Sequence, residues 1–315
     1  MLAPPSRRVD AAAPPAAARP GVQGGAMRAS GRANPLTNAL TIDVEDYFQV
    51  SAFAPYIRRD EWDARECRVE RNVDRILALL ESRGTHATFF TLGWIAERLP
   101  ALVRRIVAGG HELASHGWGH ERASDLGRAA FRADVDRARK LLEDLGGVAV
   151  RGYRAPSFSI GHANLWAIDT LLETGHVYSS SIYPVRHDHY GMPDAPRFAH
   201  RHGCGLVEIP PTTLRLAGRN LPASGGGFFR LLPYAVSRRM IERVHRADGQ
   251  PAVFYFHPWE IDPAQPRVPG VDAKTRFRHY VNLGRNEAKL ARLLADFRWD
   301  RMDQVFLPAL GVALP

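Results

Sequence analysis

Two histidines four positions apart, His116 and His120, are the residues in this sequence most suited to binding a metal ion. Imidazoles at positions i and i+4 can reach one metal ion if the chain between them turns helically. Gly117 and Gly119 lie between them, and glycine permits the tight turn that such a site requires. The same pattern also fits two surface histidines at a turn, so the metal interpretation needs support from elsewhere in the chain.

Three carboxylates, Asp43, Glu45 and Asp46, stand within four residues at the end of an apolar run. Like charges this close repel unless a cation or a proton offsets them, although an acidic loop without a metal is the alternative. Strand alternation places Asp43 and Glu45 on one side, whereas a bend after Val44 would favour Asp46, so both Glu45 and Asp46 are candidate ligands. With the two imidazoles, one carboxylate would form an open three-ligand site, on which a divalent metal activates water at neutral pH. Another of the three carboxylates could act as general base.

Two later segments add groups that would complete such chemistry. Arg154 can pair with the base carboxylate and orient it, and Pro156 fixes the following turn so that a backbone N–H near Ser157 could stabilise an oxyanion. His257 can protonate a leaving amine, and Trp259 could form an apolar platform for a sugar ring. Taken singly, the same residues also fit a structural arginine and a core histidine.

The elements that must position these residues follow from short apolar runs that alternate with helical patterns, which is typical of βα units and a parallel sheet. The predicted strands cover residues 40–42, 86–90, 111–115, 148–154, 176–180, 206–209 and 252–256. The predicted helices cover residues 69–82, 94–108, 126–145, 163–173, 231–246 and 276–297. The irregular region 183–227 is predicted to form part of a substrate-binding rim.

Seven or eight consecutive βα units favour a closed or nearly closed barrel, so the predicted fold class is α/β with a distorted (β/α)7–8 barrel. Barrel enzymes carry their chemistry at the carboxyl ends of the strands. Asp43, His116, Arg154 and His257 each fall at the end of a separate predicted strand. We therefore expect these four side chains to converge on one site.

Composition limits the remaining possibilities. The chain has 315 residues, of which 45% are hydrophobic, enough for one large domain. Residues 1–37 are rich in Ala, Pro, Gly and Arg and are predicted to be a disordered tail; this tail supplies +4 of the net charge of +9. The other basic residues are scattered, so we expect no nucleic-acid partner. With no apolar run typical of a signal peptide or membrane span, and two distant cysteines, we expect a cytoplasmic protein.

The motifs in chain order, Thr41–Asp46, His116–His120, Arg154–Pro156 and Phe256–Pro258, resemble those of the polysaccharide deacetylases with a NodB-homology domain, carbohydrate esterase family 4. The resemblance covers about residues 38–265. Three longer strings, at residues 43–50, 178–191 and 254–260, are similar to a subgroup encoded with exosortase and exopolysaccharide loci. That subgroup carries an extra C-terminal segment, which here would be about residues 266–315, packed on the barrel.

The resemblance implies one divalent metal, usually zinc, held by His116 and His120 with a carboxylate. It also implies Asp43 as catalytic base, Arg154 as the arginine that orients it, and His257 as general acid. The sequence departs from the common motif because the second acid is displaced to Glu45 or Asp46, a spacing shared with cyclic-amide hydrolases and some peptidoglycan deacetylases. It also departs at Ser157, where many members have an aromatic residue. Pro156, Ser157 and Trp259 are the predicted substrate-binding residues.

The leading hypothesis is a metal-dependent hydrolase that removes N-acetyl groups from an amino-sugar polysaccharide or its lipid-linked precursor, in exopolysaccharide biosynthesis. It would act on amide bonds other than peptide bonds. One alternative is a cyclic amide or ureide hydrolase of the same fold. Another is a non-catalytic carbohydrate-binding scaffold, and association with a membrane polysaccharide-assembly complex is a further hypothesis.

Overall fold

The main sheet of the computed structural model has nine strands, and the structure describes Met1 and residues 36–188 and 190–312. The predicted tail therefore lies almost wholly outside the described residues. The strand order is β10-β1-β2-β3-β4-β5-β7-β6, and β11 pairs with β1 beside this path. The strands are β1 (Thr37–Val44), β2 (Thr88–Thr91), β3 (Glu112–Ser115), β4 (Gly152–Tyr153), β5 (Tyr178–Ser179), β6 (His200–Arg201), β7 (Val207–Glu208), β10 (Val253–Phe256) and β11 (Arg298–Asp300).

The sheet is parallel except for the β6–β7 pair and curls into a half-barrel, which confirms the predicted α/β class. Within the described residues, the end strands β6 and β10 do not pair with each other, so the barrel stays open between them. Strands β4 to β7 contain only two residues each, whereas β1 contains eight. The strongly paired half of the sheet, β10-β1-β2-β3, therefore forms its rigid part.

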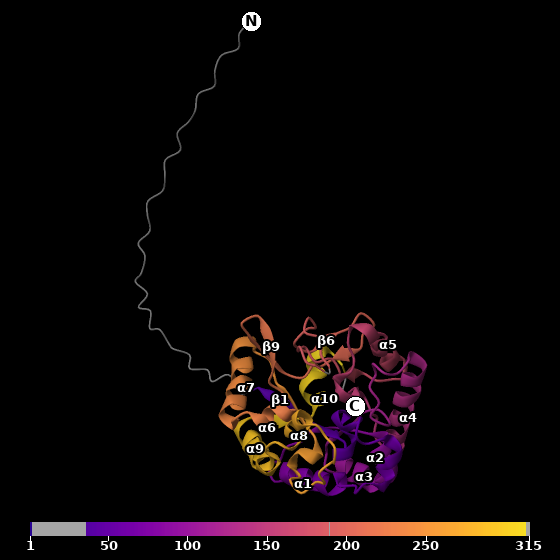
Figure 1. Cartoon of the computed structure of the whole chain (residues 1–315). Helices are drawn as coiled ribbons and strands as arrows, with labels where there is room; N and C mark the ends of the chain where they lie inside the picture. The colour runs from indigo at the N-terminus through magenta and orange to yellow at the C-terminus, as the bar shows by residue number, and fades with distance from the viewer. Residues whose placement is uncertain (2–35, 189, 313–315) are drawn as a thin grey trace. The chain divides into compact units, whose positions relative to one another are not determined.

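Helices surround this sheet, and Figure 1 shows α7, α9, α1, α3, α2, α4 and α5 as an outer ring. Two helices predicted as single are each divided in the structure. Pro100 starts a new helix after α2, because proline lacks the N–H that a continuous helix would need. Asn282, with φ of 54°, separates α8 from α9. The helices are α1 (Val69–Glu81), α2 (Gly93–Arg98), α3 (Pro100–Ala108), α4 (Arg128–Gly146), α5 (Trp166–Glu173), α6 (Gly226–Leu231), α7 (Tyr234–Asp248), α8 (Ala273–Tyr280), α9 (Leu283–Asp296) and α10 (Met302–Phe306).

The largest core cluster fills the space between the central strands and helices α1 and α9. β1 and β2 are buried over almost their full length, as expected for parallel strands covered on both faces. Trp299 in β11 joins the same cluster and packs against Phe254 of β10, with ring centroids 5.9 Å apart. The C-terminal segment thus contributes both a strand and core side chains to the half-barrel.

Region 183–227 is less irregular than predicted, because it contains a two-stranded hairpin, β8 (Thr213–Leu216) and β9 (Arg219–Pro222). Ala217 and Gly218 join the strands, and both have positive φ, as a tight two-residue hairpin turn requires. Burial does not alternate along β8, because Thr213 and Leu214 are buried whereas Arg215 and Leu216 are exposed. In the described part of the chain, none of the helices is both long and apolar enough to cross a bilayer.

Candidate active site and metal centre

A buried cluster of Glu45, His116 and His120 lies at the carboxyl ends of β1 and β3. One potential ligand atom of each residue lies within 4.8 Å of the others, and Glu45 Oε2 is 2.6 Å from His120 Nε2. His116 Nδ1 is 2.8 Å from the carbonyl oxygen of Arg154. Because a carbonyl only accepts hydrogen bonds, Nδ1 carries the proton and Nε2 keeps its lone pair for a ligand role.

The loop that joins the two histidines is not the helical turn expected from their spacing. Gly117 has φ of 77° and His120 has φ of 57°, so the chain turns through left-handed conformations instead. Asp134 of α4 accepts a hydrogen bond from Trp118 N at 3.0 Å, and Gly93 N at the start of α2 donates to Gly117 O at 2.9 Å. Two helices therefore hold the loop, and the two imidazole centroids come within 5.2 Å.

The protonation states of His116 and Glu45 favour a role as metal ligands. Burial lowers the pKa of His116 to about 4, so its imidazole is neutral at pH 7. Burial alone would raise the pKa of Glu45, but His120 and His257 nearby hold it below its usual range. A neutral imidazole and an ionised carboxylate are the forms that bind metal ions.

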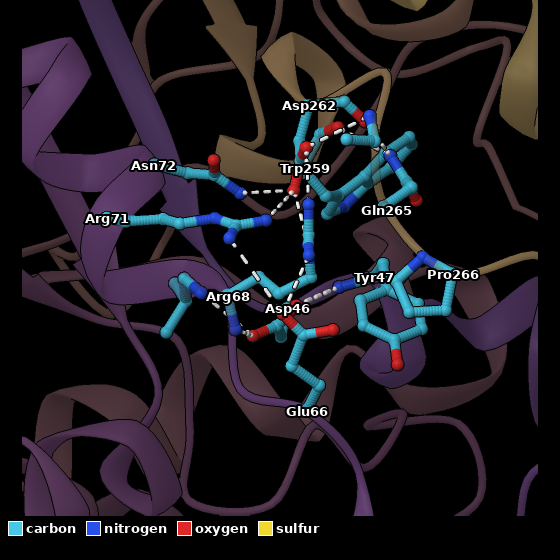
Figure 2. A network of polar contacts seen from close by, with 12 residues as sticks. Asp46, Tyr47, Glu66, Arg68, Arg71, Asn72, Trp259, Asp262, Gln265 and Pro266 are labelled. Atoms are coloured by element: carbon cyan, nitrogen blue, oxygen red, sulfur yellow. Dashed lines mark hydrogen bonds and ion pairs between the residues drawn. The ribbon is translucent and has the colours of Figure 1, made fainter.

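Asp46, the other candidate ligand, does not belong to this cluster. Its carboxylate accepts hydrogen bonds from the backbone N–H groups of Tyr47 (2.7 Å), Arg68 (2.5 Å) and Val69 (2.8 Å). Figure 2 shows this carboxylate turned toward the backbone of the neighbouring loop. Burial raises the pKa of Asp46 to about 6, and the three N–H donors oppose that rise. Its role as a metal ligand is thus corrected: Asp46 caps the short helix Tyr47–Gln49 and ties it to the start of α1.

The network in Figure 2 also joins this carboxylate loop to the segment that follows His257. The Arg68 side chain binds Asp262 through Nε at 2.6 Å and Nη2 at 2.9 Å, and Asn72 Nδ2 adds a third contact at 3.3 Å. All three side chains are buried. Arg68 therefore fixes the end of β1 relative to the end of β10.

Arg154 and Asp43 form a fully buried ion pair beside the cluster, as the sequence suggested. Arg154 Nη1 is 2.6 Å from Asp43 Oδ1 and 2.8 Å from Thr41 Oγ1. Its remaining donors reach the carbonyl and hydroxyl oxygens of Ser180 at 3.2 and 2.9 Å, and its guanidinium lies over the Phe90 ring. Arg154 therefore holds the Asp43 carboxylate in one orientation.

His257 faces the carboxylates from β10. Its Nε2 atom lies 3.9 Å from Asp43 Oδ2 and 3.6 Å from Glu45 Oε1. Its Nδ1 atom lies 2.6 Å from Glu260 Oε1. Burial by itself lowers the pKa of His257, but Glu45, Glu260 and Asp43 together raise it to about 9, so the imidazole is a proton donor at neutral pH.

Two supporting residues were missed in the sequence. Glu260 Oε2 accepts from Arg230 Nε at 2.8 Å, and the Arg230 guanidinium also donates to the carbonyl oxygens of Arg278 (3.0 Å) and His279 (2.5 Å). A signal for Glu260 was available, because it follows His257 by three positions and Pro258 starts a helical turn there. No local pattern singles out Arg230, which comes from α6.

Trp259 does not provide the predicted sugar platform. Only 5% of the residue is exposed, and His257 and His279 both stack on it, with centroids 5.2 and 4.2 Å away. Its indole Nε1 donates to Glu45 Oε1 at 3.1 Å. Because the ring is covered, the platform role is corrected, and the indole orients the Glu45 carboxylate. Trp259 also contributes to the wall of the cavity described below, and its assignment as a substrate-binding residue stays a prediction.

Pro156 and Ser157 lie in a tight turn after β4. Pro156 is buried at the start of this turn, and Ser157 adopts φ of 54° with its hydroxyl 2.6 Å from Ser51 Oγ. Ser157 faces the cavity described below. The oxyanion role of a backbone N–H near Ser157 stays a prediction.

These groups share one cavity of about 890 Å³. Asp43, Glu45, His116, His120 and His257 all contribute to its wall. The outer wall includes Tyr56, Ser157, His187, Tyr190 and Arg278. The predicted base and acid and three of the four predicted ligands therefore open onto the same space, which has the volume of a typical small-molecule site.

Comparison with known proteins agrees with this geometry. The polysaccharide deacetylase family model matches residues 60–171, and a domain of unknown function, DUF3473, matches residues 180–307. The chain is thus similar to polysaccharide deacetylases over residues 60–171 and to DUF3473 over residues 180–307. Relatives that match this chain include proteins named as deacetylases of peptidoglycan, chitooligosaccharide and chitin.

Particular relatives give the extent of the similarity. The chain is 31% identical over 109 residues to a peptidoglycan-N-acetylglucosamine deacetylase of Bacillus cereus, covering 31% of this chain and 40% of that protein. It is 30% identical over 109 residues to a chitooligosaccharide deacetylase of Sinorhizobium fredii, covering 34% and 48%. The matched part is thus less than half of either relative.

One solved structure shows the fold over nearly the whole chain. It is a Mycobacterium smegmatis protein described as a polysaccharide deacetylase, with a TM-score of 0.56 and 20% identity. The alignment covers 89% of this chain and 96% of that one. At this identity the likeness concerns the architecture alone.

Proposed function

We propose that this protein is a metal-dependent hydrolase that removes N-acetyl groups from an amino-sugar polysaccharide or its precursor. The observation that carries the proposal is the convergence of the Glu45–His116–His120 cluster, the Asp43–Arg154 ion pair and His257 on one cavity. The relatives that share the domain are named deacetylases of peptidoglycan and chitooligosaccharide.

The donor set fits a divalent metal, for which we propose zinc. Two imidazoles and one carboxylate are a common zinc set in hydrolytic enzymes. Glu45 Oε2 is buried without a hydrogen-bond partner among the described residues, although it points at His120 Nε2 only 2.6 Å away. Glu45, His116 and His120 would hold such a cation, which would satisfy the buried carboxylate oxygen. When bound, it would act as a Lewis acid and favour deprotonation of water.

The remaining steps are assigned to this chain's own side chains. Asp43, held by Arg154, accepts the proton of the attacking water. His257 lines the same cavity, and its Nδ1 is fixed by Glu260, so Nε2 is free to donate a proton to the departing amine. The Asp43 and His257 side chains are 3.9 Å apart at their nearest atoms, so both reach one scissile amide.

The test is acetate release from N-acetylglucosamine oligomers by the zinc-loaded full chain. Asp43→Asn should lower kcat by at least about a hundredfold, and its zinc content, measured by elemental analysis, should stay unchanged. Asp60→Asn, at an exposed ion pair, is the matched control. Unchanged turnover in Asp43→Asn would reject the base assignment.

The same samples separate the alternatives. Hydrolysis of hydantoin-like rings without acetate release from oligomers would favour a cyclic amide hydrolase. A chain that retains no zinc and shows no metal-stimulated activity would favour a binding scaffold.

We also propose a role in exopolysaccharide synthesis and a cytoplasmic location, with a lipid-linked oligosaccharide as the substrate form. The two cysteines, Cys67 and Cys204, are free and exposed, which supports a reducing compartment.

A further inference from the structure

A long segment after β7 contains basic residues and no acidic ones. Residues 209–241 include five arginines and no aspartate or glutamate. This stretch forms the β8–β9 hairpin, α6 and the first half of α7. Its charge is therefore positive, whereas the rest of the folded chain mixes both signs.

The same segment concentrates exposed apolar side chains. Nine large hydrophobic residues are exposed in the described part of the chain beyond Met1, and five of them fall between residues 216 and 236. They are Leu216, Leu221, Phe228, Leu231 and Val236. Scattered exposed hydrophobic residues are normal on a protein surface, but a cluster marks an interaction site.

Arginines lie on the same faces as these apolar residues. In the hairpin, Leu216 pairs with Arg219, so the two side chains share one face. In α7, Val236, Arg239 and Arg243 follow at spacings of three and four, which places them on one helical face. Among the described residues, these three arginines have no ion-pair or hydrogen-bond partner, unlike Arg238, which pairs with Glu242.

The hairpin and the two helices adjoin one another. β8 packs against α7, and a small crevice is lined jointly by Pro222 of β9, Phe228 of α6 and Met240 of α7. Figure 1 shows β9 and α7 close together at one edge of the half-barrel. We call this region, comprising Leu216, Arg219, Leu221, Phe228, Leu231, Val236, Arg239 and Arg243, the basic apolar surface.

We propose that the basic apolar surface docks the protein onto a lipid bilayer that contains anionic headgroups. A bilayer interface accepts exposed leucine and phenylalanine side chains at the acyl boundary and arginine guanidinium groups at the phosphates. Nucleic acid would use the arginines but would offer no matching surface to the leucines. Unpaired arginines beside exposed apolar side chains therefore fit an anionic membrane better than a polyanion.

The test is co-sedimentation of the full chain with vesicles of phosphatidylcholine containing about 30% phosphatidylglycerol, a typical anionic fraction. The wild type should bind these vesicles and bind pure phosphatidylcholine at least tenfold more weakly. Arg239→Gln/Arg243→Gln should reduce the partition coefficient by about fivefold for each arginine removed. Leu216→Ser/Leu221→Ser should reduce it by at least tenfold, since less apolar area is inserted.

The matched control is Arg104→Gln/Leu172→Ser, which removes an exposed arginine and an exposed leucine from α3 and α5. It should bind as the wild type does. All variants change exposed side chains, and circular dichroism with acetate release checks their folding. Wild-type binding by both surface variants would overturn the proposal, because the arginines of residues 1–37 would then account for any attraction. Failure of the wild type to bind anionic vesicles would also overturn the proposal. The same holds if the wild type and the control form a dimer and only the surface variants do not.

Discussion

The buried Arg154–Asp43 pair gives a sharp test of how the site is held together. Arg154 is fully buried and Asp43 is 2% exposed, with Nη1 and Oδ1 2.6 Å apart. Two unit charges about 4 Å apart interact by about 4 kcal/mol at an effective dielectric constant of about 20. Removing one partner of a buried pair costs about 3–5 kcal/mol, because the other charge stays buried without compensation.

We therefore expect Arg154→Met to lower the free energy of unfolding by about 3–5 kcal/mol. The assay is urea unfolding followed by circular dichroism, with a chelator present so that metal binding does not contribute. Asp43→Asn/Arg154→Met should recover part of the loss in a double-mutant cycle, since no charge is then left unpaired. Arg98→Met, which removes an exposed ion pair with Asp63, is the control and should cost less than about 1 kcal/mol. A loss in Arg154→Met as small as in this control would refute the reasoning.

Three further changes test other parts of the site. Glu45→Gln should lower the zinc content by at least tenfold in elemental analysis. Asp46→Asn should keep the zinc but lower the free energy of unfolding by about 1–3 kcal/mol, because a buried cap is weakened. Equal zinc loss in both variants would contradict the ligand assignment. Burial raises the pKa of Glu208 to about 7 from its usual 4.5, so the free energy of unfolding should fall as pH rises from about 4.5 to about 7. Glu208→Gln should flatten that part of the plot of urea midpoint against pH. An unchanged slope would exclude Glu208 as the source of the pH dependence. A Cβ at Gly117 would lie 2.7 Å from Asp134 Oδ2 at a positive φ, so Gly117→Ala should weaken zinc binding at least tenfold; wild-type affinity by titration would show that the loop adapts.

The sequence was informative about elements whose pattern is local. Helix α1 was predicted within one residue, since its apolar spacing and the following glycine are both visible in the chain. The strand ends could also be predicted, because polar residues interrupt or follow the apolar runs there, namely Asp43, His116, Arg154 and His257. Breaks within helices were harder to place: Pro100 was a visible signal, but Asn282 adopts its left-handed conformation for tertiary reasons.

The choice between Glu45 and Asp46 could not be made from the sequence, because it depends on partners far along the chain. Asp46 is held by backbone N–H groups of Arg68 and Val69, whereas Glu45 is held by His120 and by the indole N–H of Trp259. The sequence distances between these partners exceed 20 residues, so strand alternation alone does not decide the outcome. For the same reason Trp259 was misread as a platform, since only the fold shows which rings cover it.

The contacts that support His257 join residues from distant parts of the chain at one site. The metal cluster and Arg154 come from the first part of the chain, but His257 is oriented by Glu260 and, through it, by Arg230. Arg230 in turn is held by backbone carbonyls near the end of α8, and Asn286 of α9 donates to the Glu260 carbonyl at 3.2 Å. Residues beyond 265 therefore help to position His257, the proposed proton donor, because each of their contacts with Glu260 or Arg230 is buried or partly buried. A boundary drawn at residue 265 would separate His257 from residues that support it while leaving the Glu45–His116–His120 cluster in place, so the C-terminal region acts on the His257 side of the site.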